Sequence, residues 1–277
     1  MAEELKDRVA IVTGGGRGFG RAIAQRFAAE GAAVTVTART QSQLDETVTL
    51  IEEQGGRAMA VSGDVTRRED VERVVAETRD RFGPVSLLVN NAGVPDPFGP
   101  IGEVDPDRWW AAQEVHIHAP FLYISTVLPD MIEQRRGRII NISAVGGWKV
   151  APNLSAYCVG KAAQIRLTEL LAAEIVQYGL SVFAIDPGFV FTTLAEQTMN
   201  SPDAQRWLPA MVERLKARSK QQKNSEADLT RCQQRCVDLA SGRYDALSGK
   251  YMELDDDLDD MVLELESDDI TIIPADH

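Results

Sequence analysis

The chain has 277 residues, 44% of them hydrophobic, and a formal net charge of −13. This length and composition indicate one globular domain with a buried core. No apolar run approaches the roughly 20 residues that span a bilayer, so a membrane-spanning protein is not expected. The charge is uneven: residues 251–277 hold eleven Asp or Glu and no Lys or Arg, whereas the first 250 residues hold 31 acidic and 29 basic residues. A nucleic-acid partner is not expected either, because its binding requires a concentrated basic patch.

The amino-terminal sequence and the cysteines favour a cytoplasmic protein. The chain starts with MAEELKDRVAIVTGG, which has charged residues and no apolar stretch of the secretory type. Its three cysteines, Cys158, Cys232 and Cys236, are odd in number and lack the spacing of a disulfide framework. Cys232 and Cys236 have no further ligands nearby, so we interpret them as buried side chains and expect no metal site.

Short apolar runs alternate with helical patterns along the whole chain. In chain order the pattern predicts strand 8–14, helix 19–30, strand 32–38, helix 41–56, strand 57–65, a helix ending at 82, strand 85–93, helix 106–134, strand 137–143, helix 155–179, strand 180–188, a mostly helical region 190–241 and strand 246–254. This alternation predicts an α/β fold, a single Rossmann-type domain whose doubly wound parallel sheet of about seven strands has helices on both faces. We expect the domain over residues 1–254 and an acidic tail over 255–277, which packs through its apolar residues.

A glycine-rich segment, VTGGGRGFG, joins the first predicted strand to the first predicted helix. Glycine lets the backbone approach a pyrophosphate closely, and the amino end of a helix stabilises the negative charge. The position of this segment between a strand and a helix therefore predicts a dinucleotide-binding loop. The loop residues expected to bind are Thr13, Gly14, Arg17, Gly18, Phe19 and Gly20.

The end of the second predicted strand indicates which dinucleotide binds. An acidic residue there would bind the ribose 2′-hydroxyl of NAD(H) and repel the 2′-phosphate of NADP(H). The sequence has Ala38 and Arg39 instead, and Arg17 lies in the glycine loop. Two guanidinium groups near the 2′-position would bind a phosphate through charge-assisted hydrogen bonds, although one or both arginines can equally be solvated surface residues. The sequence favours NADP(H) over NAD(H).

Five motifs together make the chain resemble the short-chain dehydrogenase/reductase family over residues 5–254. They are TGGGRGFG, GDV at 63–65, NNAG at 90–93, YCVGK at 157–161 and PGFVFT at 187–192. The resemblance implies a homodimer or homotetramer that acts on a small-molecule substrate, with a substrate lid at about 189–224. It also implies further cofactor contacts: the adenine with Asp64 and Val65, the ribose side with Asn91, Ala92 and Gly93, and the nicotinamide with Pro187, Gly188 and Thr192.

Tyr157 and Lys161 are four residues apart and lie on one face of a predicted helix. A tyrosine with the ordinary pKa of about 10 is a poor acid–base catalyst at neutral pH, and an adjacent ammonium group lowers that pKa. In the family that the chain resembles, the lysine also binds the nicotinamide ribose, and the tyrosine exchanges a proton with the substrate oxygen. Both residues are therefore expected to be catalytic and to contact the cofactor.

Two further positions depart from the family pattern. The family usually has a serine thirteen residues before the tyrosine, where this chain has Ala144. The neighbouring Ser143 can supply the missing hydroxyl only if the strand end is irregular, because adjacent strand residues point to opposite faces. His116 stands where an asparagine is usual, and three interpretations are open. The imidazole maintains a water relay to Lys161, it acts as an extra acid–base group, or it is a hydrogen-bonded helix histidine without a catalytic role. Ser143 and His116 are candidate catalytic residues.

These observations predict an NADP(H)-dependent oxidoreductase that interconverts a secondary alcohol and a ketone. Loss of one oxyanion-type donor costs about 10²–10³ in rate, which weakens an enzyme without abolishing it. The alternatives are a non-redox lyase or isomerase on the same scaffold, and a cofactor-binding protein with little catalysis. Five apolar residues in or near the predicted lid either line a substrate pocket or belong to the core: Trp148, Phe189, Phe191, Met199 and Trp207. The first interpretation favours a small, partly hydrophobic substrate.

Overall fold

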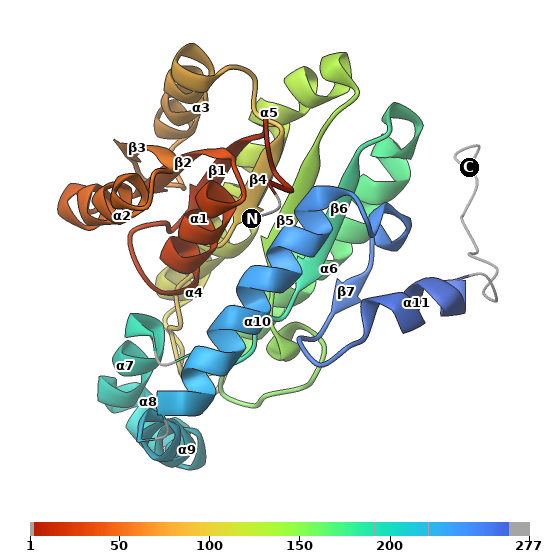
Figure 1. The fold of residues 1–277 in the computed structure, drawn as a ribbon. Coiled ribbons are helices and arrows are strands. Elements are labelled where there is room, and N and C mark those ends of the chain that lie inside the picture. Colours follow the sequence, from red (N-terminus) through yellow and green to blue (C-terminus); the bar gives the residue numbers. More distant parts are fainter. Residues whose placement is uncertain (1–2, 191, 221, 266–277) are drawn as a thin grey trace.

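A single sheet of seven parallel strands forms the centre of the molecule in the computed structural model, which describes residues 3–190, 192–220 and 222–265. The strand order is β3-β2-β1-β4-β5-β6-β7 (Figure 1), and every neighbouring pair is parallel. The strands are β1 (Val9–Thr13), β2 (Ala33–Ala38), β3 (Arg57–Ser62), β4 (Leu87–Asn90), β5 (Arg138–Ile142), β6 (Ser181–Ile185) and β7 (Tyr251–Met252). The predicted single domain with a parallel α/β sheet is confirmed.

Helices cover both faces of this sheet (Figure 1). One face carries α1 (Gly18–Ala29), α2 (Gln41–Glu53) and α10 (Gln222–Ser241), and the other carries α3 (Arg68–Phe82), α5 (Ala119–Gln134) and α6 (Ser155–Ile175). Successive residues of β1 divide between the two layers, because Ala10 and Val12 pack in the first core and Ile11 packs in the second. A strand buried on both faces needs a nearly continuous apolar run, which is the pattern seen in the sequence.

The strand order reverses at β1, which creates a crevice at the carboxyl ends of β1 and β4. The chain moves outward from β1 to β3 and then returns to pair β4 with the other side of β1. Thr13 Oγ1 ties the two strand ends together by accepting hydrogen bonds from Asn91 N at 2.9 Å and Ala92 N at 3.1 Å. Ligands of doubly wound sheets bind at such a reversal point, so the fold places a candidate site here.

The long helix predicted over 106–134 is interrupted in its middle. It consists of α4 (Pro106–Gln113), a π-helical turn called η1 (Glu114–His118), and α5. Pro120 has no N–H group, so the hydrogen bond that a regular helix would form to the carbonyl oxygen of His116 is missing. Such π-helical turns are frequent at functional sites.

The segment after β6 forms α7 (Thr193–Asn200), α8 (Pro202–Trp207), α9 (Pro209–Ser219) and α10. In Figure 1, α7, α8 and α9 project at the bottom of the molecule, below the sheet. The acidic tail begins with α11 (Leu258–Leu265), whose Leu258 is buried in the first core while Met261, Val262 and Leu265 pack against it. Residues 266–277 of the predicted tail lie outside the described residues. Short 3₁₀ turns complete the described elements: η2 (Val145–Gly147), η3 (Val176–Tyr178) and η4 (Asp245–Leu247).

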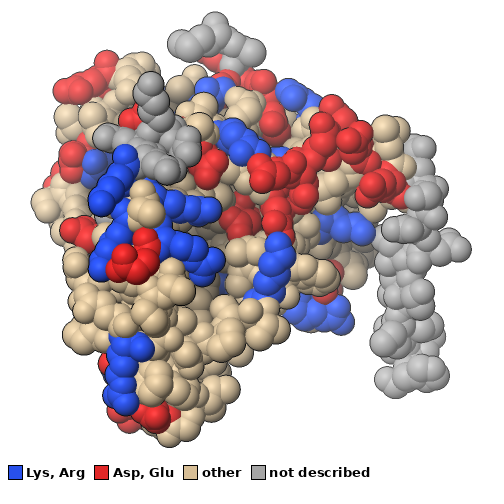
Figure 2. Space-filling view, turned by 90° about the horizontal axis from the view of Figure 1, so that it is seen from below, with Lys and Arg blue, Asp and Glu red and all other residues tan. Residues whose placement is uncertain are grey.

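Charges of both signs share the surface seen from below. Figure 2 shows Lys and Arg side chains spread over this face, with Asp and Glu side chains lying among them.

Candidate active site

The glycine loop after β1 is shaped for the close approach of a ligand. Gly14 and Gly18 have φ angles of 65° and 56°, in the left-handed region that favours glycine. A Cβ at Gly20 would lie 2.3 Å from the carbonyl oxygen of Gly14, so no side chain fits there. The helix α1 follows with no acidic residue in its first turn and no side-chain cap from Arg17. The N–H groups and the dipole of this helix end therefore fit a pyrophosphate.

The other predicted cofactor residues lie at the same edge of the sheet. They follow the carboxyl ends of β3, β4 and β6, which meet at one edge because the strands are parallel: Asp64, Val65, Asn91, Ala92, Gly93, Pro187, Gly188 and Thr192. A Cβ at Gly18 would lie 3.1 Å from Thr192 Cγ2, so the segment after β6 reaches the glycine loop. The structure thus brings the predicted pyrophosphate and nicotinamide segments together.

Two arginines stand where the sequence predicts the 2′-position of the cofactor. Arg39 follows β2 directly and Arg17 begins α1, and both side chains are exposed. Within the described part of the chain, neither guanidinium group forms an ion pair or a hydrogen bond. Their positive charge is available to an anion at the edge of the crevice.

Tyr157 and Lys161 lie together on α6, and the lysine is deeply buried. Lys161 is 4% exposed, and its Nζ donates hydrogen bonds to the carbonyl oxygen of Ile142 at 2.6 Å and to Gln164 Oε1 at 3.2 Å. Nζ lies 5.7 Å from the centre of the Tyr157 ring. Burial lowers the pKa of Lys161 to about 7, and the nearby carboxylate of Asp186 opposes this shift.

The phenol of Tyr157 is protonated at neutral pH. Burial, followed by the negative charge of Asp186, raises its pKa above the ordinary value. This direction differs from the expectation that Lys161 lowers the pKa of Tyr157, because burial and the charges of Asp186 and Cys158 all raise it. The residue is therefore in the state that a proton donor requires.

His116 is completely buried in η1 and packs against Tyr157. Its Nε2 lies 2.9 Å from the carbonyl oxygen of Val94, so this nitrogen carries the proton and donates, while Nδ1 is buried without a hydrogen-bond partner. Burial and the charge of Lys161 lower the pKa of His116 to about 3, which keeps the imidazole neutral. The rings of His116 and Tyr157 meet edge to face, with centres 5.5 Å apart. This geometry favours a role in positioning Tyr157 over a role in proton transfer.

The hydroxyl of Ser143 is already engaged with α6. Its Oγ donates to the carbonyl oxygen of Lys161 at 3.0 Å, and the side chain is buried. The next residue, Ala144, is extended and also buried. The N–H group of Val145 then donates to Asp186 Oδ2 at 2.6 Å. Asp186, which the sequence analysis missed, thus joins η2 to the end of β6 beside Tyr157 and Lys161.

An apolar cluster adjoins Tyr157 on the side of α8 and α9. Its members are Phe98, Leu154, Ala204 and Val212, with Ala151, Tyr157, Cys158, Leu208 and Met211 packed against them. Of the aromatic residues named from the sequence, Trp148 is 72% exposed and the Phe189 ring lies 4.8 Å from the Arg218 guanidinium group. Trp207 lies next to the cluster, because a Cβ at Gly99, the neighbour of Phe98, would lie 3.4 Å from its ring. Phe191 lies outside the described residues. The cluster depends on contacts between distant segments, so local sequence did not predict its members. The sequence indicated only that a substrate lid follows the sixth predicted strand.

The described residues contain no group of three or more His, Cys, Asp or Glu arranged to hold a metal ion. Cys232 and Cys236 are buried side by side in the first core. No helix in residues 3–190, 192–220 and 222–265 has the length and apolar character needed to cross a membrane.

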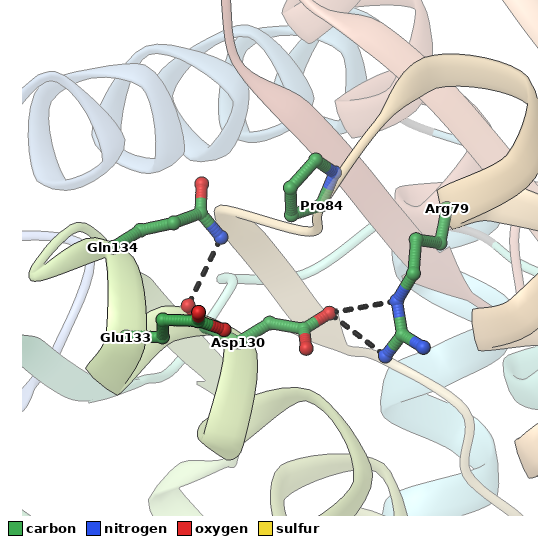
Figure 3. Close-up of a pocket in the computed structure, with 5 residues that line it drawn as sticks. All are labelled: Arg79, Pro84, Asp130, Glu133 and Gln134. Atoms are coloured by element: carbon green, nitrogen blue, oxygen red, sulfur yellow. Dashed lines mark hydrogen bonds and ion pairs between the residues drawn. The ribbon is translucent and has the colours of Figure 1, made fainter.

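A separate surface pocket lies at the opposite edge of the sheet (Figure 3). It has a volume of about 410 Å³ and is lined by Arg79, Pro84, Asp130, Glu133 and Gln134. The guanidinium group of Arg79 pairs with the carboxylate of Asp130 at 2.8 Å. Pro84 precedes β4, and residues 130–134 precede β5, so this pocket lies at the amino ends of the strands and outside the crevice.

Comparisons with known proteins agree with this fold and site. The family model for short chain dehydrogenases matches residues 8–203. A short chain dehydrogenase of Pseudocercospora fijiensis is 35% identical over 271 residues, which cover 96% of this chain and 85% of that protein. Among solved structures, a metagenomic short-chain oxidoreductase in complex with NADP has 34% identity and a TM-score of 0.64 over 68% of this chain and 85% of its own. An NAD⁺-bound xylitol dehydrogenase has 26% identity and a TM-score of 0.76 over 90% of this chain and 98% of its own.

The chain belongs to the short-chain dehydrogenase/reductase family. It is an oxidoreductase of the type that binds a nicotinamide cofactor, and the predicted family and enzyme class are confirmed. The similar structures include one with NADP and one with NAD⁺, so the choice of cofactor rests on the residues of this chain.

Proposed function

We propose that the protein is an NADP(H)-dependent oxidoreductase that interconverts a secondary alcohol and a ketone on a small, partly hydrophobic substrate. The observation that carries this proposal is the placement of Tyr157 beside the buried Lys161 at the edge of the sheet that also holds the glycine loop. When bound, a nicotinamide cofactor supplies or accepts the hydride, and the chain supplies the proton.

Tyr157 donates its phenolic proton to the carbonyl oxygen during reduction and accepts the proton of the alcohol during oxidation. The ammonium group of Lys161 stabilises the phenolate that reduction leaves behind. The edge-to-face contact with His116 holds the phenol ring in place. Burial lowers the pKa of His116 to about 3, so its imidazole is a weak base, and its Nε2 proton is engaged by the carbonyl oxygen of Val94. These observations do not favour the lyase or isomerase alternative, which needs a second proton-transfer group.

The apolar cluster beside Tyr157 supports a substrate with a hydrophobic body next to its reacting oxygen. Phe98, Leu154 and Met211 come from three separate segments and belong to this one cluster with Tyr157. Burial of apolar substrate surface contributes about 25 cal/mol per Å², so a short alkyl or ring substituent adds affinity here.

The free guanidinium groups of Arg17 and Arg39 support the preference for NADP(H). Each can form charge-assisted hydrogen bonds with a 2′-phosphate, and neither has to leave a partner among the described residues to do so.

A turnover assay with matched tyrosine variants tests the proposal. The absorbance of reduced nicotinamide is followed with NADPH or NADH and a panel of small ketones and secondary alcohols. We expect turnover with NADPH, its loss in Tyr157→Phe, and its retention in Tyr178→Phe, which makes the same change beyond the other end of α6. Unchanged activity in Tyr157→Phe would show that this tyrosine is not the proton donor.

A further inference from the structure

The amide of Gln164 connects Lys161 to a different segment of the chain. Gln164 is buried and lies three residues after Lys161, on the same face of α6. Its Oε1 accepts a hydrogen bond from Lys161 Nζ at 3.2 Å, and its Nε2 donates one to the carbonyl oxygen of His116 at 2.8 Å. One side chain therefore spans from the catalytic lysine to the π-helical turn.

The carbonyl oxygen of His116 is available to Gln164 because of the local sequence. In a regular helix it would accept a hydrogen bond from residue 120, but this residue is Pro120 and has no N–H group. A buried carbonyl oxygen without a partner costs free energy, so the amide of Gln164 satisfies an acceptor that the helix leaves open. The close approach of the two segments depends on Gly160, where a Cβ would lie 2.5 Å from His116 Cβ.

We propose that Gln164 is a positioning residue of the catalytic site, which holds the Lys161 ammonium group beside Tyr157 and favours its protonated form. The proposal rests on the proposed function of Tyr157 and Lys161 as the proton-transferring pair. It assigns the second hydrogen bond of Lys161 to a fixed side chain, in addition to the bond to the carbonyl oxygen of Ile142.

The surroundings of Lys161 make each acceptor important. Among the described residues, three titratable groups interact with it: Tyr157 on α6, His116 on η1 and Asp186 after β6. His116 is neutral and Tyr157 is protonated, so neither carries a charge that favours the ammonium group. The carboxylate of Asp186 counters the lowering of the Lys161 pKa by burial. An amide oxygen in contact with Nζ stabilises the ammonium form in the same direction.

Two substitutions of nearly equal volume separate a positioning role from a packing role. Gln164→Met removes the acceptor and is expected to lower the pH at which ketone reduction declines on the alkaline side by about one unit. Gln164→Glu places a carboxylate against the ammonium group and is expected to raise that pH by one unit or more. A purely structural role would lower the rate or the stability and would not move the two profiles in opposite directions.

The matched controls are Gln134→Met and Gln134→Glu, at an exposed glutamine at the other edge of the sheet. These controls should leave the profile of kcat/KM against pH unchanged. Gln164→Asn retains the amide but is one methylene shorter, so it cannot reach both partners and should behave like Gln164→Met. It serves as the test if Gln164→Met does not fold by circular dichroism.

A second readout does not depend on activity. The titration of Lys161 is followed in the cofactor-free protein by NMR of carbon-13-labelled lysine, with the signal assigned by its loss in Lys161→Met. We expect Gln164→Met to lower the pKa of Lys161 and Gln164→Glu to raise it, in the same directions as the changes in the rate profiles. Profiles and titrations that stay in place, or that move in one common direction, overturn the proposal. An unmutated protein that reduces no ketone but shows the predicted Lys161 titrations would refute the proposed function and leave the positioning role intact.

Discussion

Replacing Arg39 by alanine should weaken the binding of NADPH and leave the binding of NADH nearly unchanged. Arg39 lies directly after β2, is exposed and has no ion-pair or hydrogen-bond partner among the described residues, so its loss removes no polar contact within them. The change therefore tests the attraction between its guanidinium group and the 2′-phosphate with little disturbance of the fold.

The size of the effect follows from the exposure of the side chain. Two unit charges 4 Å apart attract by about 1 kcal/mol in bulk water and by about 4 kcal/mol at the effective dielectric constant of a protein surface. An exposed guanidinium group next to a phosphate falls between these limits, at about 2 kcal/mol. This free energy corresponds to a roughly 30-fold increase in the dissociation constant of NADPH. Because the pair is exposed, the effect should shrink as the salt concentration rises.

The assay is a fluorescence titration of reduced cofactor against the unmutated protein, Arg39→Ala and the control Arg57→Ala. Arg57 is also an exposed arginine but begins β3 at the opposite edge of the sheet, so its loss should change neither dissociation constant. Arg39→Asp should go further and favour NADH, because a carboxylate here can bind the 2′-hydroxyl. Equal affinities for NADPH and NADH in the unmutated protein would refute the reasoning.

Four other outcomes are expected. Ala144→Ser should change ketone reduction by tenfold or less, since an added hydroxyl can aim at the reacting oxygen; complete loss of ketone reduction would indicate a site reshaped for other chemistry. Gly160→Ala should lower stability to denaturant by about 1–3 kcal/mol, because its Cβ would lie 2.5 Å from a side-chain carbon of η1. The stability of the cofactor-free protein should rise between about pH 7 and pH 10: the pKa of Lys161 is lowered to about 7, so the unfolded chain binds more protons in this range, and Lys161→Met should remove the rise. Light scattering should show a dimer or tetramer, since α5 and α6 expose Phe121 and Leu170, and a monomer at micromolar concentration would contradict this.

The strands could be predicted because burial on both faces leaves a nearly continuous apolar run in the sequence. The residues at which the strands begin and end were harder to predict. The strand predicted over 246–254 is reduced to Tyr251–Met252, because η4 turns the chain at Asp245–Leu247 and Gly249 has a φ of 90°. The π-helical turn inside the helix predicted over 106–134 was also missed, since the helical periodicity does not show where one extra residue enters a turn.

The proximity of Tyr157 and Lys161 could be predicted because it depends on helical spacing alone. Gln164 shares this face of the helix, so its spacing from Lys161 was a signal. Its second contact, to the carbonyl oxygen of His116, depends on how α6 packs against η1 and cannot be read from local sequence. The same holds for Asp186, whose carboxylate binds the N–H group of Val145, 41 residues earlier in the chain.

The π-helical turn η1 lies between the two halves of one long helix. On its amino-terminal side, Trp109 Nε1 donates to Ser155 Oγ at 3.1 Å and Gln113 Nε2 donates to the carbonyl oxygen of Ala156 at 3.0 Å. A π-helical turn holds about one residue more than an α-helical turn, so it accommodates the extra residue and keeps α4 and α5 in phase. Deletion of a single residue within Glu114–His118 would therefore restore a regular helix and leave Trp109 and Gln113 facing the start of α6. The deletion would remove the wide turn that carries His116, so the turn matters for the contacts of this residue and not for the orientation of α4.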